Sequence, residues 1–245
     1  MVLASREVIS LDVPVPFDTA WVHLRRPELI RRWYGWDEPD LDEQIDRVFF
    51  REAAVHRPES GLPMGWLRWH NHDVIEVRGG WGTKPRTTLV MRRQDYDQID
   101  SYDGVRDEAD ERWITWIEQL HYALTYHLGE DRHAFAMHDL DSDRPDRLLG
   151  RAGLGSVRGL PVGAAVEIHR PDGSLLGGIL DFNVRYQFGV ALKGGSLLVV
   201  QVAPPASHKP NGAVSAYWST YGLDEEGLDA ARQRWSGWWR TPVGA

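Results

Sequence analysis

The chain has 245 residues, of which 42% are hydrophobic, and it carries 12 tryptophans, no cysteine and a formal net charge of −8. This composition is typical of a globular chain and excludes disulfides and thiolate chemistry. The acidic balance argues against a nucleic-acid partner. No apolar stretch approaches the roughly 20 residues that cross a bilayer, and the opening MVLASREVIS lacks a secretion-signal pattern. We therefore expect a soluble, cytoplasmic protein that does not bind membranes.

The first half of the chain predicts a strand, two short helices, several antiparallel strands and a long helix. Alternating apolar residues predict a strand over Glu7–Val15. Asp18 is the expected N-cap of a short helix, and Pro27 begins a second one. Residues 37–46 are acidic and predict a solvated loop that enters a strand at 47–51. Turn residues separate three further expected strands, namely Gly65–His70, Asp73–Arg78 and Arg86–Arg92.

A long amphipathic helix is predicted over Asp103–Leu128. Its apolar residues recur at spacings of three and four, which places them on one face: Trp113, Trp116, Ile117, Leu120, Ala123, Leu124 and Leu128. Acidic residues crowd the first turns, and Gly129 follows as a stop signal. A face with two tryptophans needs a broad apolar partner, most simply a sheet.

The second half of the chain repeats this order in a weaker form. His133–His138 is the expected opening strand, and residues 143–151 resemble residues 25–32. Four further strands are expected, at Ala164–Arg170, Leu175–Asp181, Val184–Leu192 and Leu197–Ala203. A closing helix carries the apolar stripe Leu228, Ala231, Trp235, Trp238 and Trp239. We therefore predict two α+β domains, residues 1–130 and 131–245, each a curved antiparallel β-sheet wrapped on a long C-terminal α-helix.

The sequence contains no specific catalytic motif. The segment from Gly212 to Ala216 lacks the second glycine of a nucleophile elbow, and the glycines at 150–155 lack dinucleotide-binding spacing. His70 and His72 would share one face of a strand, but two imidazoles alone do not make a metal site. The carboxylates of residues 37–43 are better explained as a solvated loop than as an acid/base pair. We predict no catalytic residue, metal or cofactor.

Aromatic residues are the remaining candidates for function. Many lie on the segments expected to face the long helix, where plain core packing is the simplest explanation. The sharper alternative is an apolar cavity in which indole and phenol groups supply a few polar contacts. The predicted ligand-binding residues are Trp33, Tyr34, Trp66, Trp69, Trp81, Trp113, Trp116, Ile117 and Leu120.

Three segments of the first half resemble the START-like helix-grip (SRPBCC) superfamily: residues 13–21 (VPVPFDTAW), 26–34 (RPELIRRWY) and 113–128. The first two look like the opening of the branch related to activators of a heat-shock chaperone ATPase. The resemblance covers residues 5–128, and residues 133–243 look like a diverged second copy. The resemblance implies a sheet that wraps a long helix, with a cavity between them that often binds a hydrophobic small molecule.

Three functions remain open at this point. The first is a non-catalytic protein that binds a hydrophobic or aromatic small molecule between the sheet and the C-terminal helix. The second is an aromatase/cyclase-type enzyme, which would need a proton shuttle from His70, His72, Tyr34 or Asp73. The third is a ligand-free protein-interaction regulator, which would expose aromatic residues around Trp235, Trp238 and Trp239. A homodimer is compatible with each of these.

Overall fold

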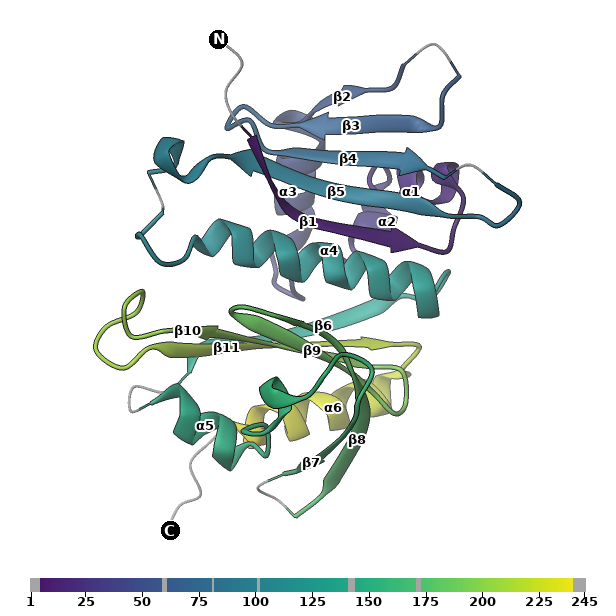
Figure 1. Ribbon diagram of the computed structural model, residues 1–245. Helices are drawn as coiled ribbons and strands as arrows, with labels where there is room; N and C mark the ends of the chain where they lie inside the picture. Colours follow the sequence, from purple (N-terminus) through teal and green to yellow (C-terminus); the bar gives the residue numbers. More distant parts are fainter. Residues whose placement is uncertain are drawn as a thin grey trace. The chain divides into compact units, whose positions relative to one another are not determined.

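The structure is a computed structural model that describes residues 5–58, 61–80, 82–100, 102–140, 144–170 and 173–239. The chain divides into two compact units, Met1–Asp131 and Arg132–Ala245 (Figure 1). Each unit contains one antiparallel sheet, and the two sheets have five and six strands. In the described part of the chain, no helix has the length and apolarity to span a bilayer.

The first unit is an antiparallel sheet covered on one face by helices. Its strands are ordered β1-β5-β4-β3-β2, with bounds β1 Ser5–Val13, β2 Ala54–His56, β3 Met64–Arg68, β4 Val74–Gly79 and β5 Thr87–Gln94. Its helical segments are α1 Phe17–His23, α2 Pro27–Ile30, α3 Leu41–Asp46, the π-helix η1 Arg47–Arg51, the 3-10 turn η2 Tyr96–Gln98 and the long α4 Glu108–Tyr126.

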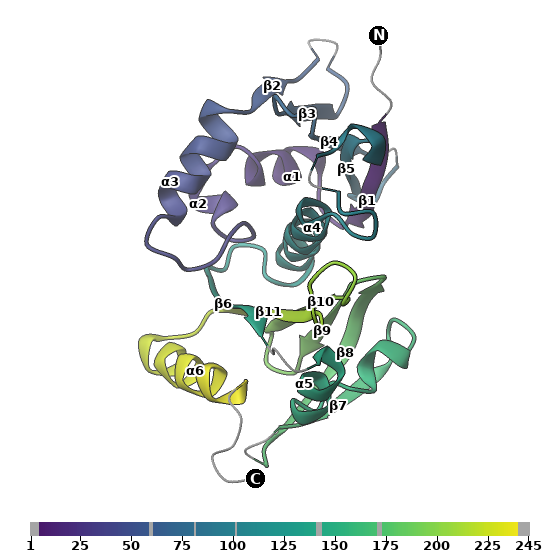
Figure 2. The same cartoon turned by 90° about the vertical axis from the view of Figure 1, so that its left-hand side faces the viewer.

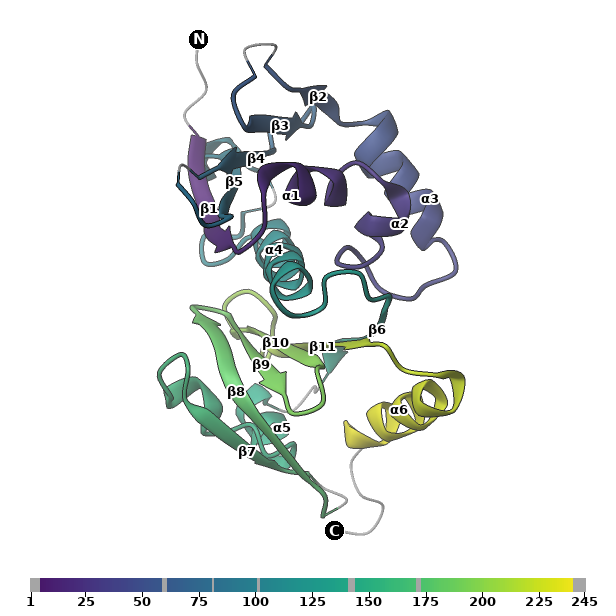
Figure 3. The same cartoon turned by 90° about the vertical axis from the view of Figure 1, so that its right-hand side faces the viewer.

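The predicted amphipathic helix is confirmed as α4. Asp107 caps its start, because a carboxylate oxygen of Asp107 accepts a hydrogen bond from the backbone N–H of Ala109. Trp113, Ile117, Leu120 and Leu124 belong to one core with the inward residues of the sheet, among them Leu67, Ile75 and Met91. Leu128 lies beyond the end of the helix and is 55% exposed, so its predicted place on the buried face is wrong. Figure 3 looks along α4 and shows α1 on the same side of the sheet. The long helix therefore seals the concave side of the first sheet.

The region after the second short helix corrects two predictions. Residues 41–46 are helical rather than a solvated loop, and 47–51 continue as a π-helix rather than a strand. Leu41, Ile45 and Phe49 explain this, because their spacing of four places all three on one helical face, and each is at most 1% exposed. The predicted N-cap at Asp18 is also wrong, since Pro16 occupies the cap position of α1.

The second unit has the same plan with one more strand. Its sheet is ordered β6-β11-β10-β9-β8-β7, with bounds β6 Arg132–Leu140, β7 Ala165–His169, β8 Leu175–Val184, β9 Gln187–Leu192, β10 Leu197–Ala203 and β11 Ala213–Tyr221. Its helices are α5 Pro145–Arg151, the 3-10 turn η3 Val157–Gly159 and α6 Glu225–Trp238. Both α5 and α6 lie on one side of the sheet (Figure 2).

Alternation along the strands separates the two faces of this sheet. Leu198 and Val200 of β10 and Ala216 and Trp218 of β11 belong to the core that α5 and α6 cover. The sequence prediction missed β11, which lies between β6 and β10. In each unit the first strand pairs antiparallel with the last, β1 with β5 and β6 with β11. The predicted fold, two antiparallel sheets each closed by a C-terminal helix, is confirmed.

Candidate functional site

The aromatic residues predicted as a ligand site in the first unit largely pack on one another. Six of the nine predicted residues are buried in the core: Trp33, Tyr34, Trp69, Trp113, Ile117 and Leu120. Trp116 is partly buried and packs against them. Phe49, which the prediction did not include, joins them, with its ring 4.9 Å from Tyr34 and 5.5 Å from Trp33.

Two of the predicted residues are not part of this set. Trp66 lies on β3 one position before Leu67, so its side chain points to the opposite face of the sheet. There it stacks on His56, with ring centroids 4.0 Å apart. Trp81 lies outside the described residues.

The buried indole N–H groups of the first unit mostly have protein acceptors. Trp33 donates to the carbonyl of His23 at 2.9 Å, and Trp69 donates to the carbonyl of Val48 at 2.7 Å. Trp113 donates to a carboxylate oxygen of Asp73 at 3.2 Å. The indole N–H of Trp116 is buried and has no acceptor among the described residues. The aromatic core is thus satisfied internally except at its Trp116 edge.

Tyr34 lies at this same edge, 4.5 Å from Trp116 between ring centroids. Burial raises the pKa of its phenol to about 12, although the positive charges of Arg47 and Arg112 oppose the shift. The phenol is therefore neutral near pH 7 and is not a proton acceptor there. Tyr34 and Trp116 can contribute aromatic surface and hydrogen-bond donors at this position.

A buried ionic cluster lies beside Trp113 and anchors the start of α4 to the sheet. Arg93 of β5 contacts the carboxylates of Asp73, Asp107 and Asp110 at 2.9, 2.7 and 2.6 Å. Arg6 of β1 joins through Asp110 at 2.7 Å. Burial lowers the pKa of Arg93, but the three carboxylates outweigh it and hold that pKa above its ordinary value. The arginine stays charged, and the cluster serves to position α4.

The residues proposed for a proton shuttle are not brought together. His70 and His72 are exposed in the turn between β3 and β4, where His72 has φ of +64°, so they do not share a strand face. Asp73 is buried and paired with Arg93. The described residues of the first unit therefore provide no histidine–carboxylate pair for acid/base chemistry at these positions.

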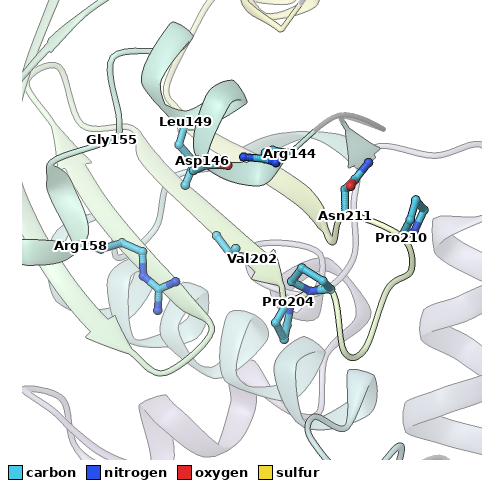
Figure 4. A pocket seen from close by; sticks show the side chains of 10 residues that line it. Arg144, Asp146, Leu149, Gly155, Arg158, Val202, Pro204, Pro210 and Asn211 are labelled. Carbon is cyan, nitrogen blue, oxygen red and sulfur yellow. The ribbon is translucent and has the colours of Figure 1, made fainter.

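The second unit contains a pocket of about 660 Å³. It lies between α5, η3 and the end of β10, and the loop after β10 closes one side (Figure 4). Its apolar lining comes from Leu149, Val202, Pro204, Pro205 and Pro210. Val202 continues the inward face of β10 beyond Leu198 and Val200. The pocket is therefore an opening onto the helix-covered face of the second sheet.

A few polar side chains complete the pocket. Arg144, Asp146, Arg158 and Asn211 line it together with Gly155. Arg158 donates a hydrogen bond from its guanidinium to the carbonyl of Arg185. Arg144 and Asp146 come from the α5 side of the pocket, whereas Arg158 reaches in from the other wall (Figure 4). The sequence reasoning missed this site, and its only signal was the proline-rich loop at 204–210.

The tryptophans of the second unit differ from those of the first. Trp238 donates to the carbonyl of Ala152 at 3.2 Å. The indole N–H groups of Trp218, Trp235 and Trp239 are buried and have no acceptor among the described residues. All three belong to the core between the sheet and α6, so the expected exposed aromatic patch around Trp235, Trp238 and Trp239 is wrong. An unpaired buried donor costs about 1–3 kcal/mol.

Comparisons with known proteins return solved structures only. No protein-family model and no curated protein matches the chain. DynU16, from the dynemicin biosynthetic locus, is 13% identical with a TM-score of 0.34, covering 96% of this chain and 94% of its own. The di-domain ARO/CYC StfQ, from the steffimycin biosynthetic pathway, is 10% identical with a TM-score of 0.28, covering 95% and 92%. XoxI from Bacillus cereus is 14% identical with a TM-score of 0.28, covering 44% and 89%.

Proposed function

We propose that this chain is a binding protein for a hydrophobic or aromatic small molecule, and that the pocket of the second unit is its principal site. The pocket carries the proposal. Its volume of about 660 Å³ lies in the range of ligand pockets, roughly 300–1,000 Å³. A mostly apolar lining with a few polar side chains is the composition that such sites share.

Three unpaired indoles in the core between the second sheet and α6 offer a second place for a ligand, separate from the pocket, which none of them lines. Trp218, Trp235 and Trp239 bury donors that an acceptor on a bound molecule would satisfy. Their rings also offer a broad aromatic surface on the helix-covered side of the sheet, with Trp235 5.7 Å from Trp218 and 5.2 Å from Trp239. Aromatic surface with a few donors suits a flat ligand that carries oxygen atoms.

In the first unit the proposal concerns the edge formed by Tyr34 and Trp116. The deeper aromatic residues have their N–H groups satisfied by protein acceptors, which favours a structural role for them. Trp116 retains an unpaired buried donor. A ligand at this edge would contact the neutral phenol of Tyr34 and accept from the Trp116 indole.

Titration with N-phenyl-1-naphthylamine, a neutral aromatic probe whose fluorescence rises in apolar sites, tests the principal site. We expect saturable binding to the full chain. Val202→Trp fills the pocket floor and should abolish that binding. Val162→Trp adds the same side chain at a position 58% exposed and should leave it unchanged. Absence of saturable binding, or equal binding by a folded Val202→Trp variant, would refute the proposal.

A further inference from the structure

We infer that the pocket of the second unit selects molecules in which an apolar body carries a carboxylate, and that Arg158 is the residue that pairs with this carboxylate. The inference rests on the proposed function. It adds the charge of the ligand and the residue that binds the charged group. Three observations carry it, namely the charges that line the pocket, the way Arg158 is held, and the apolar surface beside it.

The charges of the pocket favour an anion at Arg158. Two arginines and one aspartate line the pocket. Arg144 and Asp146 bring one positive and one negative charge to the α5 side of the pocket, whereas Arg158 stands on the other wall (Figure 4). Among the described residues, Arg158 makes no ion pair, and its guanidinium donates a hydrogen bond to the carbonyl of Arg185. A neutral carbonyl leaves the positive charge of Arg158 uncompensated in a chain whose net charge is −8.

Arg158 is also held in place before any ligand arrives. The side-chain amide of Asn183 donates to the carbonyl of Arg158 at 3.0 Å and to that of Leu160 at 3.4 Å, which fixes the backbone of η3. Val157 anchors the same turn, with a side chain only 1% exposed. The bond to the Arg185 carbonyl uses one of the five guanidinium N–H groups and leaves others for a ligand. Less rotamer entropy is then lost on binding.

The remaining lining specifies what the carboxylate is attached to. Leu149, Val202 and the three prolines present apolar surface with little conformational freedom. A free inorganic anion would leave that surface exposed to water, whereas an arene or alkyl chain would cover it. A guanidinium binds a carboxylate through two parallel hydrogen bonds, which also fixes the ligand's orientation. An amphipathic organic acid uses both parts of the site.

A pair of matched probes tests the inference. 1-Pyrenebutanoic acid and 1-pyrenebutanol share the arene and the chain and differ in the head group. We expect the acid to bind the full chain at least about tenfold more tightly than the alcohol at neutral pH, as a charge-assisted hydrogen bond implies. Arg158→Gln should weaken the acid to about the level of the alcohol and change the alcohol far less, and the circular dichroism spectrum reports whether the variant is folded.

Two further variants separate Arg158 from general positive charge. Arg147→Gln removes an exposed arginine of α5 that does not line the pocket, and it should change neither affinity by more than about twofold. Arg144→Gln should have the smaller effect of the two lining arginines, since Asp146 places a negative charge on the same wall as Arg144. Equal binding of acid and alcohol by the unmodified chain would overturn the inference and leave the proposed function standing. Loss of the acid preference in Arg147→Gln or Arg144→Gln but not in Arg158→Gln would overturn the assignment, and absence of binding by both probes would overturn the proposed function as well.

Discussion

Arg92 and Arg93 are neighbours on β5, yet their side chains lie on opposite faces of the first sheet. Arg93 is buried among the carboxylates of Asp73, Asp107 and Asp110. Arg92 is one-third exposed on the outer face and pairs with Glu7 at 3.2 Å and with Glu76 at 3.8 Å. Two residues of one type, one position apart, therefore allow a comparison in which only burial and the number of carboxylates differ.

Replacing Arg93 by Met should lower the free energy of unfolding by about 3–5 kcal/mol, because three buried carboxylates lose their common partner. Arg92→Met removes two solvent-accessible ion pairs and should cost about 1 kcal/mol or less. Urea denaturation of the two variants measures the difference. Equal costs would show that the cluster at the start of α4 contributes no more than a surface ion pair.

The helical assignment of residues 41–51 can be tested at Ile45. Its side chain is 1% exposed and packs in the core with Leu41 and Phe49. Ile45→Ala should cost about 2–5 kcal/mol, as expected for deleting a buried aliphatic side chain. Val55→Ala, at a position 46% exposed, should cost less than about 0.5 kcal/mol. An Ile45→Ala cost as small as that of Val55→Ala would favour the solvated loop.

The stability of the first unit should depend on pH through His23. Burial lowers the pKa of this histidine and the positive charge of Arg32 adds to the effect, although the hydrogen bond from its Nδ1 to the carbonyl of Thr19 opposes it. Below about pH 6.5 the unfolded chain takes up a proton at this histidine that the folded chain does not. The free energy of unfolding therefore decreases as the pH is lowered. Above about pH 6.5 His23 is neutral in both states, and no stability is lost through its protonation.

His23→Gln removes this titration. We expect the unfolding free energy of the variant to fall less steeply than that of the unmodified chain as pH decreases below about 6.5. Chemical denaturation at a series of pH values gives the two slopes. Identical slopes would mean that His23 does not stay neutral in the folded state.

Gly189 of β9 should not tolerate a side chain. A Cβ at this position would lie 2.1 Å from the ring of Phe182, its partner across the strand pair with β8. Gly189→Ala should cost about 1–3 kcal/mol through overpacking. Gly237→Ala is the matched control, since nothing lies within 4 Å of the added carbon, and it should be neutral or slightly stabilising within helix α6. Thermal denaturation distinguishes the two.

Local patterns predicted the elements in which they were strong. The spacing of Trp113, Ile117, Leu120 and Leu124 is long and regular enough to identify α4. Helix α3 was missed because its acidic residues outnumber its two buried apolar residues, Leu41 and Ile45. Strand β11 was missed because Ser215, Ser219 and Thr220 interrupt its apolar pattern, although its neighbours β6 and β10 supply most of its environment.

The candidate sites show a similar division. Trp66 and Trp69 are three positions apart, and strand alternation alone separates Trp66 from the inward-facing Leu67. That signal was available in the sequence. The pocket was not predictable in this way, because Leu149, Arg158 and Val202 come from three elements that only the folded chain brings together. The pairing of Arg93 with Asp73 and Asp107 likewise depends on tertiary contacts.

The strand order described above has a consequence for synthesis on the ribosome. β1 pairs with β5 and β6 pairs with β11, so the opening strand of each unit has no sheet partner until the last strand of that unit has been made. About 75 residues separate Val13 from Thr87, its partner in β5, and such long-range closure slows folding. Each sheet is nevertheless complete within its own half of the chain. We therefore expect the first half to acquire its core while the second half is still being translated.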